Sequence, residues 1–211
     1  TQITYAPGST FKPFVALAAM KEGIANLGSY YDCPAEYVHP GDESGAIFHN
    51  WDGTSGGVLS IAEGLKVSCD TQYYKFGSDF YFRDADTNEE ELQRSMRRWG
   101  FGRETGIDLP AEAVGTVPDR AYVAEQPEVY PDGWIPGIDI LLAIGSGEMK
   151  ATPLQVAQAY AALAGGKLRR PHLERHLIDG DHAAEPDGEP VDRERGGRHR
   201  LGLGFRPLRG R

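Results

Sequence analysis

Two long stretches without a helical period divide this chain into blocks. Residues 26–58 and 100–137 are rich in Gly, Pro, Asp and aromatic residues, which favour turns and short strands. The segments around them are rich in Ala, Leu and Met and are bounded by residues that start and stop helices. We therefore expect several helices that are separated by turn-rich excursions with short strands.

Two helical segments are predicted in the first half of the chain. One follows Pro13 and ends at Gly23, because glycine is typical of the position just past a helix end. The other runs from Leu59 to about Phe76. Short polar residues at 68–70 predict a break within it, since they favour caps and turns.

Two further helices are predicted from capping boxes. Thr87 with Glu90 predicts one helix start, and Gly100 ends that helix. Its apolar stripe consists of Leu92, Met96 and Trp99. Thr152 with Gln155 predicts the other start, with proline at the first helical position, and the helix ends at the following Gly-Gly pair.

The charge of the chain is unevenly distributed. It has 211 residues, of which 22 are basic and 31 acidic, for a net charge of −9. Residues 193–211 hold seven Arg and one acidic residue, which leaves 15 basic and 30 acidic residues elsewhere. Because such an acidic body is unsuited to a phosphate backbone, we expect no nucleic-acid partner.

The C-terminal segment differs from the rest of the chain. Residues 179–211 have no apolar period, and after residue 193 they are mostly Arg, Gly, Leu and Pro. Three interpretations are open: a solvated, disordered tail, a nucleic-acid-binding arm, or out-of-frame translation of a gene rich in G and C. We therefore divide the chain into residues 1–178 and 179–211.

No membrane anchor is visible in the sequence. The longest apolar runs, such as residues 138–144, are far shorter than the ~18 residues that a membrane span needs. The chain opens on Thr1 and has no signal peptide. We interpret it as a fragment and expect any anchor or export signal upstream.

Two cysteines, Cys33 and Cys69, are too few for a disulfide framework and lack metal-ligand spacing. We expect both to be small buried residues rather than a disulfide bridge.

Ser9 and Lys12 form an S-x-x-K motif within PGSTFKP. About one such motif is expected by chance in a chain of this length, so the context matters. Both residues lie at the start of a predicted helix, one turn apart, where free N–H groups suit a developing oxyanion. A partly buried lysine can lose its charge and accept the serine proton. The alternative is that Ser9 caps the helix and Lys12 is a surface charge.

Ser68-Cys69-Asp70 is the only S-x-[N/D] sequence in the chain, and it falls in the predicted helix break. A hydroxyl and a short polar acceptor on a buried turn can pass a proton to a leaving group and orient a lysine. The alternative is a plain turn in which Asp70 caps a helix.

With these motifs, residues 1–178 resemble the transpeptidase domain of class B penicillin-binding proteins. Asp70, in place of the more usual Asn, is most similar to the elongation-type members, which crosslink side-wall peptidoglycan. Four segments carry the resemblance in family order: PGSTFKP, VSCDTQYY, FGRETGIDLPAEAVGTVPD and AIGSGEMKATPLQVAQAYAALAGG.

The resemblance implies a role for each motif residue. Ser9 would be the acylated nucleophile and Lys12 its proton acceptor. Ser68 would relay a proton to the leaving group, and Asp70 would contact Lys12 and the substrate. The family's third motif, Lys-Ser/Thr-Gly, which binds the substrate carboxylate and completes the oxyanion hole, is absent from this sequence.

The resemblance also implies a fold and a function. The fold would be α+β, an antiparallel sheet flanked by helices, of which this chain supplies chiefly the helical part. The reaction would be D,D-transpeptidation of D-Ala-D-Ala stem peptides, with no metal or organic cofactor, at the extracytoplasmic face of a bacterial membrane. Expected partners are stem peptides, β-lactams and the cell-wall synthesis machinery.

Four alternatives to a transpeptidase are open: a β-lactamase, a D,D-carboxypeptidase, a non-catalytic β-lactam-sensing module and a non-functional gene fragment.

Overall fold

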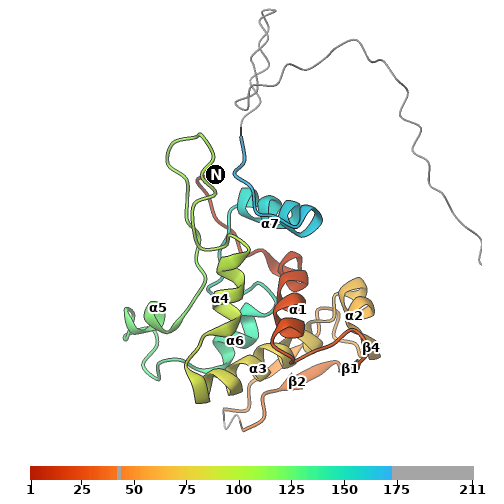
Figure 1. Ribbon diagram of the computed structural model, residues 1–211. Coiled ribbons are helices and arrows are strands. Elements are labelled where there is room, and N and C mark those ends of the chain that lie inside the picture. The colour runs from red at the N-terminus through yellow and green to blue at the C-terminus, as the bar shows by residue number, and fades with distance from the viewer. Residues whose placement is uncertain (42–43, 173–211) are drawn as a thin grey trace, which may run out of the picture. The chain divides into compact units, whose positions relative to one another are not determined.

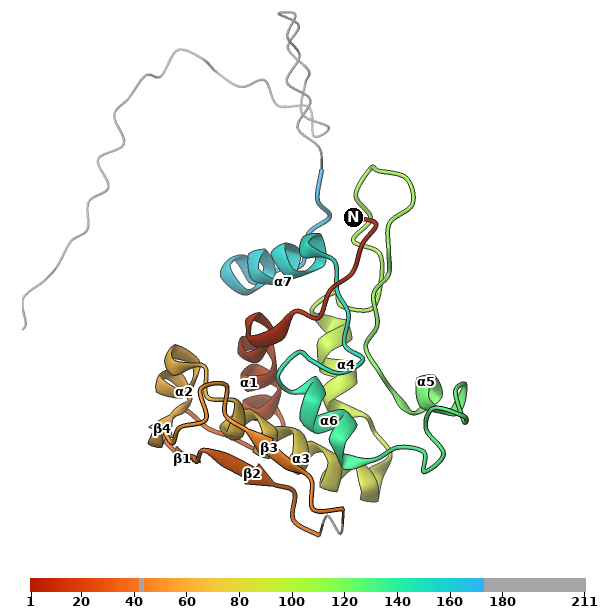
Figure 2. The same ribbon diagram turned by 180° about the vertical axis from the view of Figure 1, so that it is seen from behind.

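The computed structural model describes residues 1–41 and 44–172 of the chain. The predicted boundary at 178/179 and the predicted tail lie outside these residues. Helices are the main regular structure of the described part, and two small sheets lie on one side of it (Figures 1 and 2). In chain order the elements are η1 (Gly8–Phe11), α1 (Lys12–Lys21), β1 (Tyr30–Cys33), β2 (Glu36–Val38), β3 (Ile47–His49), β4 (Gly57–Ser60), α2 (Ile61–Val67), α3 (Asp70–Thr87), α4 (Glu91–Arg98), α5 (Arg120–Ala124), α6 (Pro136–Leu142) and α7 (Pro153–Gly165).

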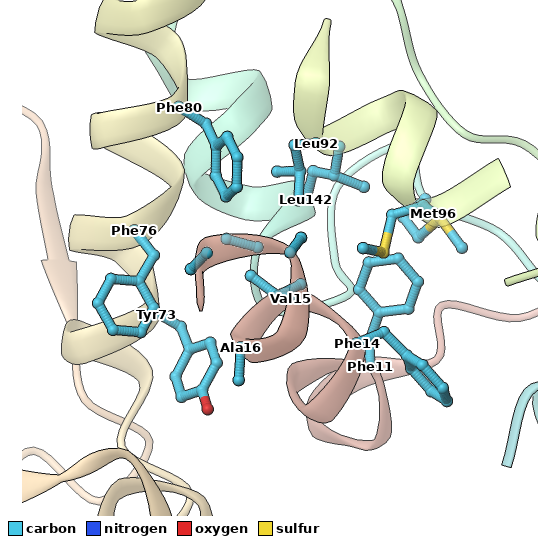
Figure 3. Close-up of a cluster of buried hydrophobic side chains, with 14 of the residues drawn as sticks. Phe11, Phe14, Val15, Ala16, Tyr73, Phe76, Phe80, Leu92, Met96 and Leu142 are labelled. Carbon is cyan, nitrogen blue, oxygen red and sulfur yellow. The ribbon is translucent and has the colours of Figure 1, made fainter. Parts of the chain in front are cut away.

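The hydrophobic core surrounds α1. Its side chains meet residues of α3, α4 and α6 in one continuous cluster (Figure 3). Phe11 and Phe14 contact Phe101, with ring centroids 4.9 and 5.4 Å apart, and all three rings are fully buried. Because α1 is covered on several sides, its sequence is apolar nearly throughout, as expected for a buried helix. The core therefore fixes the helix that begins at Lys12.

Two antiparallel strand pairs form the sheets. β1 pairs with β4, from Tyr30 opposite Ser60 to Cys33 opposite Gly57. β2 pairs with β3 in a second sheet. The turn-rich stretch at residues 26–58 thus contains the short strands that its composition predicts. The fold has the expected class, a helix-dominated α+β arrangement with small antiparallel sheets.

The prediction for the two cysteines is half wrong. Cys33 and Cys69 are fully buried, as expected, but they are joined by a disulfide, with Cα atoms 6.1 Å apart. Their sequence separation of 36 residues hides this proximity. The β1–β4 pairing returns the chain to β1, and α2 then leads directly to Cys69, so the two thiols meet.

The two predicted capping boxes have opposite outcomes. The Thr152–Gln155 box is present at the start of α7, which ends at Gly165 with Gly166 in a left-handed conformation. The Thr87–Glu90 box is wrong, because Thr87 is the last residue of α3 and its hydroxyl donates to the Arg83 carbonyl. The Glu90 carboxylate instead accepts from the Arg120 N–H at 2.7 Å.

A buried carboxylate links α4 to α6. Asp139 on α6 is fully buried and accepts hydrogen bonds from Gln93 Nε2 at 2.6 Å and Trp134 Nε1 at 3.0 Å. Burial raises the pKa of Asp139 to about 7. α3 lies close to α6 here, since a Cβ at Gly77 would be 2.5 Å from the Asp139 carbonyl oxygen.

Candidate active site

The predicted nucleophile lies in η1, directly before α1. This 3₁₀ turn starts at Gly8, ahead of the helix predicted after Pro13, and it continues into α1 at Lys12. Ser9 is exposed on this turn, whereas Lys12 is 1% exposed. One helical turn therefore takes the chain from a solvent-accessible hydroxyl to a buried ammonium group.

The second predicted motif lies in the break between α2 and α3. Ser68 follows α2 in a left-handed conformation, with φ 58° and ψ 41°. Cys69 caps the N-terminus of α3, where its Sγ accepts from the Gln72 N–H, and Asp70 is the first residue of α3. The break predicted at 68–70 is confirmed, and it turns Ser68 and Asp70 toward Lys12.

Hydrogen bonds join all four predicted site residues. The Lys12 Nζ donates to Asp70 Oδ1 at 2.5 Å, to the Ser68 carbonyl at 2.8 Å and to Ser68 Oγ at 3.0 Å. Ser68 Oγ in turn donates to Ser9 Oγ at 2.9 Å. The structure therefore places Ser68 between Ser9 and Lys12, the residue that the motif predicts as the acceptor of the Ser9 proton.

The environment of Lys12 acts on its charge in two directions. Burial lowers the pKa of Lys12, and this effect is the largest. The hydrogen bond and the negative charge of Asp70 raise the pKa and oppose it. The Tyr73 ring, whose centroid is 5.5 Å from Nζ, also favours the ammonium form. The net result is a lysine that loses its proton more readily than one in water.

The loop after α6, which contains Gly145, supports η1, the turn that carries Ser9. The Gly8 N–H donates to the Gly145 carbonyl at 2.9 Å. Gly145 has φ +70°, and a Cβ there would lie 2.5 Å from the Gly8 carbonyl oxygen. The Tyr160 hydroxyl on α7 donates to the Thr10 carbonyl at 2.9 Å. Two segments distant in sequence thus fix the turn that carries Ser9.

Asn50 also contacts the site, although the sequence did not predict it. Asn50 is 7% exposed, and its Oδ1 accepts from the Asp70 N–H at 2.9 Å. It lies in the turn-rich stretch, where no spacing or period distinguishes one polar residue from its neighbours. Pairing of β2 with β3 brings it to α3.

Residues 1–41 and 44–172 contain neither a candidate metal site nor a candidate membrane span. In this part of the chain, no three or more His, Cys, Asp or Glu side chains are grouped so that they could hold a metal ion. The helices described there include none with the length and hydropathy of a membrane span.

The order of these motifs and their geometry define a class of protein. Residues 1–195 match the penicillin-binding protein transpeptidase domain. The chain belongs to this family.

Individual relatives show which members of the family this chain is similar to. Peptidoglycan D,D-transpeptidase MrdA of Acinetobacter baumannii is 31% identical over 185 residues, which cover 88% of this chain and 25% of that protein. PBP2 of Pseudomonas aeruginosa, solved in complex with WCK 5153, superposes with a TM-score of 0.70 at 33% identity, over 90% of this chain and 40% of that one. PBP2 of Helicobacter pylori, solved in complex with MreC, gives 0.69 at 30% identity, over 84% and 31%.

These relatives confirm the resemblance to elongation-type members of the family. The chain spans about a quarter of the length of MrdA of Acinetobacter baumannii.

Proposed function

We propose that this chain carries the nucleophile and the general base of a peptidoglycan D,D-transpeptidase and works within a longer protein. The observation that carries the proposal is the hydrogen-bonded series Ser9–Ser68–Lys12–Asp70. Such a series provides both a nucleophile and a base of lowered pKa, as acyl transfer requires.

The first step is acylation of Ser9. Its Oγ attacks the carbonyl carbon of the D-Ala-D-Ala peptide bond in a stem peptide. When Lys12 is neutral, its lone pair accepts the Ser68 proton, and Ser68 accepts the proton of Ser9. This is possible because a hydroxyl group can rotate and act either as donor or as acceptor. The proton thus reaches Nζ through two contacts of 2.9 and 3.0 Å.

The tetrahedral intermediate then collapses. The Ser9 N–H lies in the first turn of η1, where N–H groups have no partner within the helix, and it stabilises the oxyanion. A second donor would come from the family's third motif. Lys12 returns its proton through Ser68 to the departing amine, so that D-alanine leaves and an ester to Ser9 remains.

Resolution of the ester separates the candidate functions. In a transpeptidase, the amine of a neighbouring stem peptide attacks the ester carbonyl and a new peptide bond forms. In a β-lactamase or a D,D-carboxypeptidase, water attacks instead, and a β-lactam-sensing module keeps its acyl group without turning over a stem peptide. The likeness to MrdA and PBP2 favours the transpeptidase. β-Lactams would acylate the same serine.

The proposed setting is the extracytoplasmic face of a bacterial membrane. The Cys33–Cys69 disulfide supports it, since disulfides persist in oxidising compartments. PBP2 of Helicobacter pylori is found in complex with MreC. We therefore include the cell-wall synthesis machinery among the partners, together with stem peptides.

The fate of the acyl group tests this function. The full-length protein is incubated with a D-Ala-D-Ala stem peptide, with and without an amine acceptor, and D-alanine and crosslinked product are measured. Separately, the lifetime of a penicilloyl adduct is followed. We expect crosslinked product and a long-lived adduct. Rapid hydrolysis of the adduct would indicate a β-lactamase, and a stable adduct with no release of D-alanine would indicate a sensor.

A further inference from the structure

The turn that carries Ser68 and Asp70 is covalently tied to a strand. Cys69, between them, is bonded to Cys33, the last residue of β1. Both sulfur-bearing side chains are fully buried. Gly56 lies against the bridge, since its N–H donates to the Cys33 carbonyl and a Cβ there would be 2.9 Å from Cys33 Sγ. The bridge is therefore packed into the fold beside the site.

Asn50 makes a second tie to the same turn. Its Oδ1 accepts from the Asp70 N–H at 2.9 Å, while its own N–H donates to the Ala35 carbonyl at 2.8 Å. Its Nδ2 donates to the Thr54 carbonyl at 2.9 Å. One buried residue, through its side-chain amide and its backbone N–H, thus connects the start of α3 to the segments that flank β2 and β3.

This turn needs external support. Ser68 has positive φ, a conformation that costs a residue other than glycine about 1 kcal/mol or more. A non-glycine residue keeps such a conformation only where its surroundings impose it. On one side Lys12 binds the Ser68 carbonyl and Asp70, and on the other the disulfide and Asn50 bind Cys69 and Asp70.

We propose that the Cys33–Cys69 disulfide and Asn50 act together as positioning residues for acylation. They hold Ser68 within hydrogen-bond distance of Ser9 and Lys12, and they hold the Asp70 carboxylate on Lys12. We call the three residues the brace. This inference rests on the proposed function, because it assigns the brace a part in the reaction at Ser9.

If the brace positions Ser68, acylation should depend on the disulfide. Dithiothreitol donates two electrons to the bridge, which becomes two thiols, and is itself oxidised to its cyclic disulfide. Without the bridge the turn can shift, and a displacement of about 1 Å can cost up to ~10²-fold in rate. At saturating fluorescent penicillin, we expect the first-order rate constant of acylation to fall about ten-fold or more in reduced protein and in Cys33→Ser, and to fall in Asn50→Ala.

The experiment separates positioning from folding. The full-length protein is used, and both the rate constant and the final labelled fraction are recorded. A loss of folded protein lowers the final fraction, whereas misplacement of Ser68 lowers the rate constant. Cys33→Ser should be insensitive to dithiothreitol, and reoxidation of the wild-type protein should restore its rate. Asp119→Ala, which removes the cap of the distant helix α5, should lower stability and leave the rate constant unchanged (Figure 1).

The outcomes distinguish this inference from the proposed function. If oxidised wild-type protein is not acylated at Ser9, the proposed function is wrong, and the inference that rests on it falls as well. If the wild-type protein is acylated, and the reduced protein and Asn50→Ala react within two-fold of it, only the brace is wrong. These two samples decide the question even if Cys33→Ser does not fold.

Discussion

Two opposing effects act on the pKa of Lys12. Its ammonium group is taken out of water, which lowers its pKa, and it is bound to a carboxylate, which raises it. In the proposed mechanism the neutral amine of Lys12 acts as the base, and Asp70 orients that amine. We infer that Asp70 holds the Lys12 amine in place but also raises its pKa, so that Lys12 becomes neutral only at a higher pH.

Asp70→Asn tests this balance. The substitution keeps a side chain that can accept from Nζ but removes the negative charge that favours the ammonium form, so the pKa of Lys12 should fall. As the pH is lowered, the wild-type protein should lose acylation rate first. In the variant, the acid limb of the pH–rate profile should lie about one pH unit lower. The profile is measured as the second-order rate constant with a fluorescent penicillin.

Asp79→Asn is the matched control, since Asp79 is bound to Lys75 on the surface of α3. Its profile should coincide with that of the wild-type protein. Coincident profiles for the wild-type protein and Asp70→Asn would mean that Asp70 does not influence the base.

At the residue scale, the structure brings the four motif residues together, whereas the sequence did not reveal what surrounds them. Ser9, Lys12, Ser68 and Asp70 could be found because family spacing marks them, and the structure brings all four together. Asn50 could not be found, because its position depends on strand pairing across the turn-rich stretch.

Among the elements, the loop after α6 contacts η1, the turn that carries Ser9, through Gly145. We predict that Gly145→Ala lowers the free energy of unfolding by about 1–3 kcal/mol and also slows acylation, since the new Cβ would displace Gly8. Urea unfolding and penicillin labelling measure the two effects.

Gly133→Ala is its control. Gly133 has nearly the same conformation, φ +69°, but a Cβ there would meet nothing within 4 Å. Both variants share the cost of positive φ, so the difference between them isolates the contact with η1. Equal acylation rates for the two variants would show that Gly145 does not position Ser9.

The contact between α4 and α6 should make stability depend on pH. The pKa of Asp139 is raised in the folded state, by burial and by the nearby Asp84, to about 7. Below about pH 4 the carboxyl is protonated in both states. As the pH rises to about 7, only the unfolded state ionises, so the free energy of unfolding should fall over this range and then level off.

Asp139→Asn should remove this decrease in the free energy of unfolding between about pH 4 and 7, as measured by urea unfolding at several pH values. Asp132→Asn, at an exposed position before the same helix, should keep it. If the free energy of unfolding of Asp139→Asn depended on pH as that of the wild-type protein does, Asp139 would not be the group responsible.

The helices α5 and α6 were not predicted from the sequence, and the predicted capping boxes gave one correct helix start and one wrong one. The Thr152 box was predicted correctly because Pro153 and a following apolar period support the same start. The Thr87 box failed because α3 continues through Thr87 to a left-handed Asn88, so that a Thr-x-x-Glu pattern arises at a helix end. The disulfide was missed because its loop of 36 residues is closed by strand pairing rather than by local sequence.

For the molecule as a whole, the sequence lacks the Lys-Ser/Thr-Gly motif that completes the oxyanion hole in this family. We predict that the 211-residue chain alone is acylated slowly or not at all, since one oxyanion donor is worth about 10²–10³ in rate. Labelling of the purified chain with fluorescent penicillin measures this. Stoichiometric labelling would contradict the prediction.

The central claim is that Ser9 is acylated and that the Ser68–Lys12 pair removes its proton. Peptide mapping by mass spectrometry after penicillin treatment of the full-length protein tests it most directly. We expect a penicilloyl adduct on the peptide that contains Ser9, none in Ser9→Ala, and acylation slowed by about 10²-fold or more in Ser68→Ala. An adduct retained in full by Ser9→Ala, or an unchanged rate in Ser68→Ala, would contradict the account.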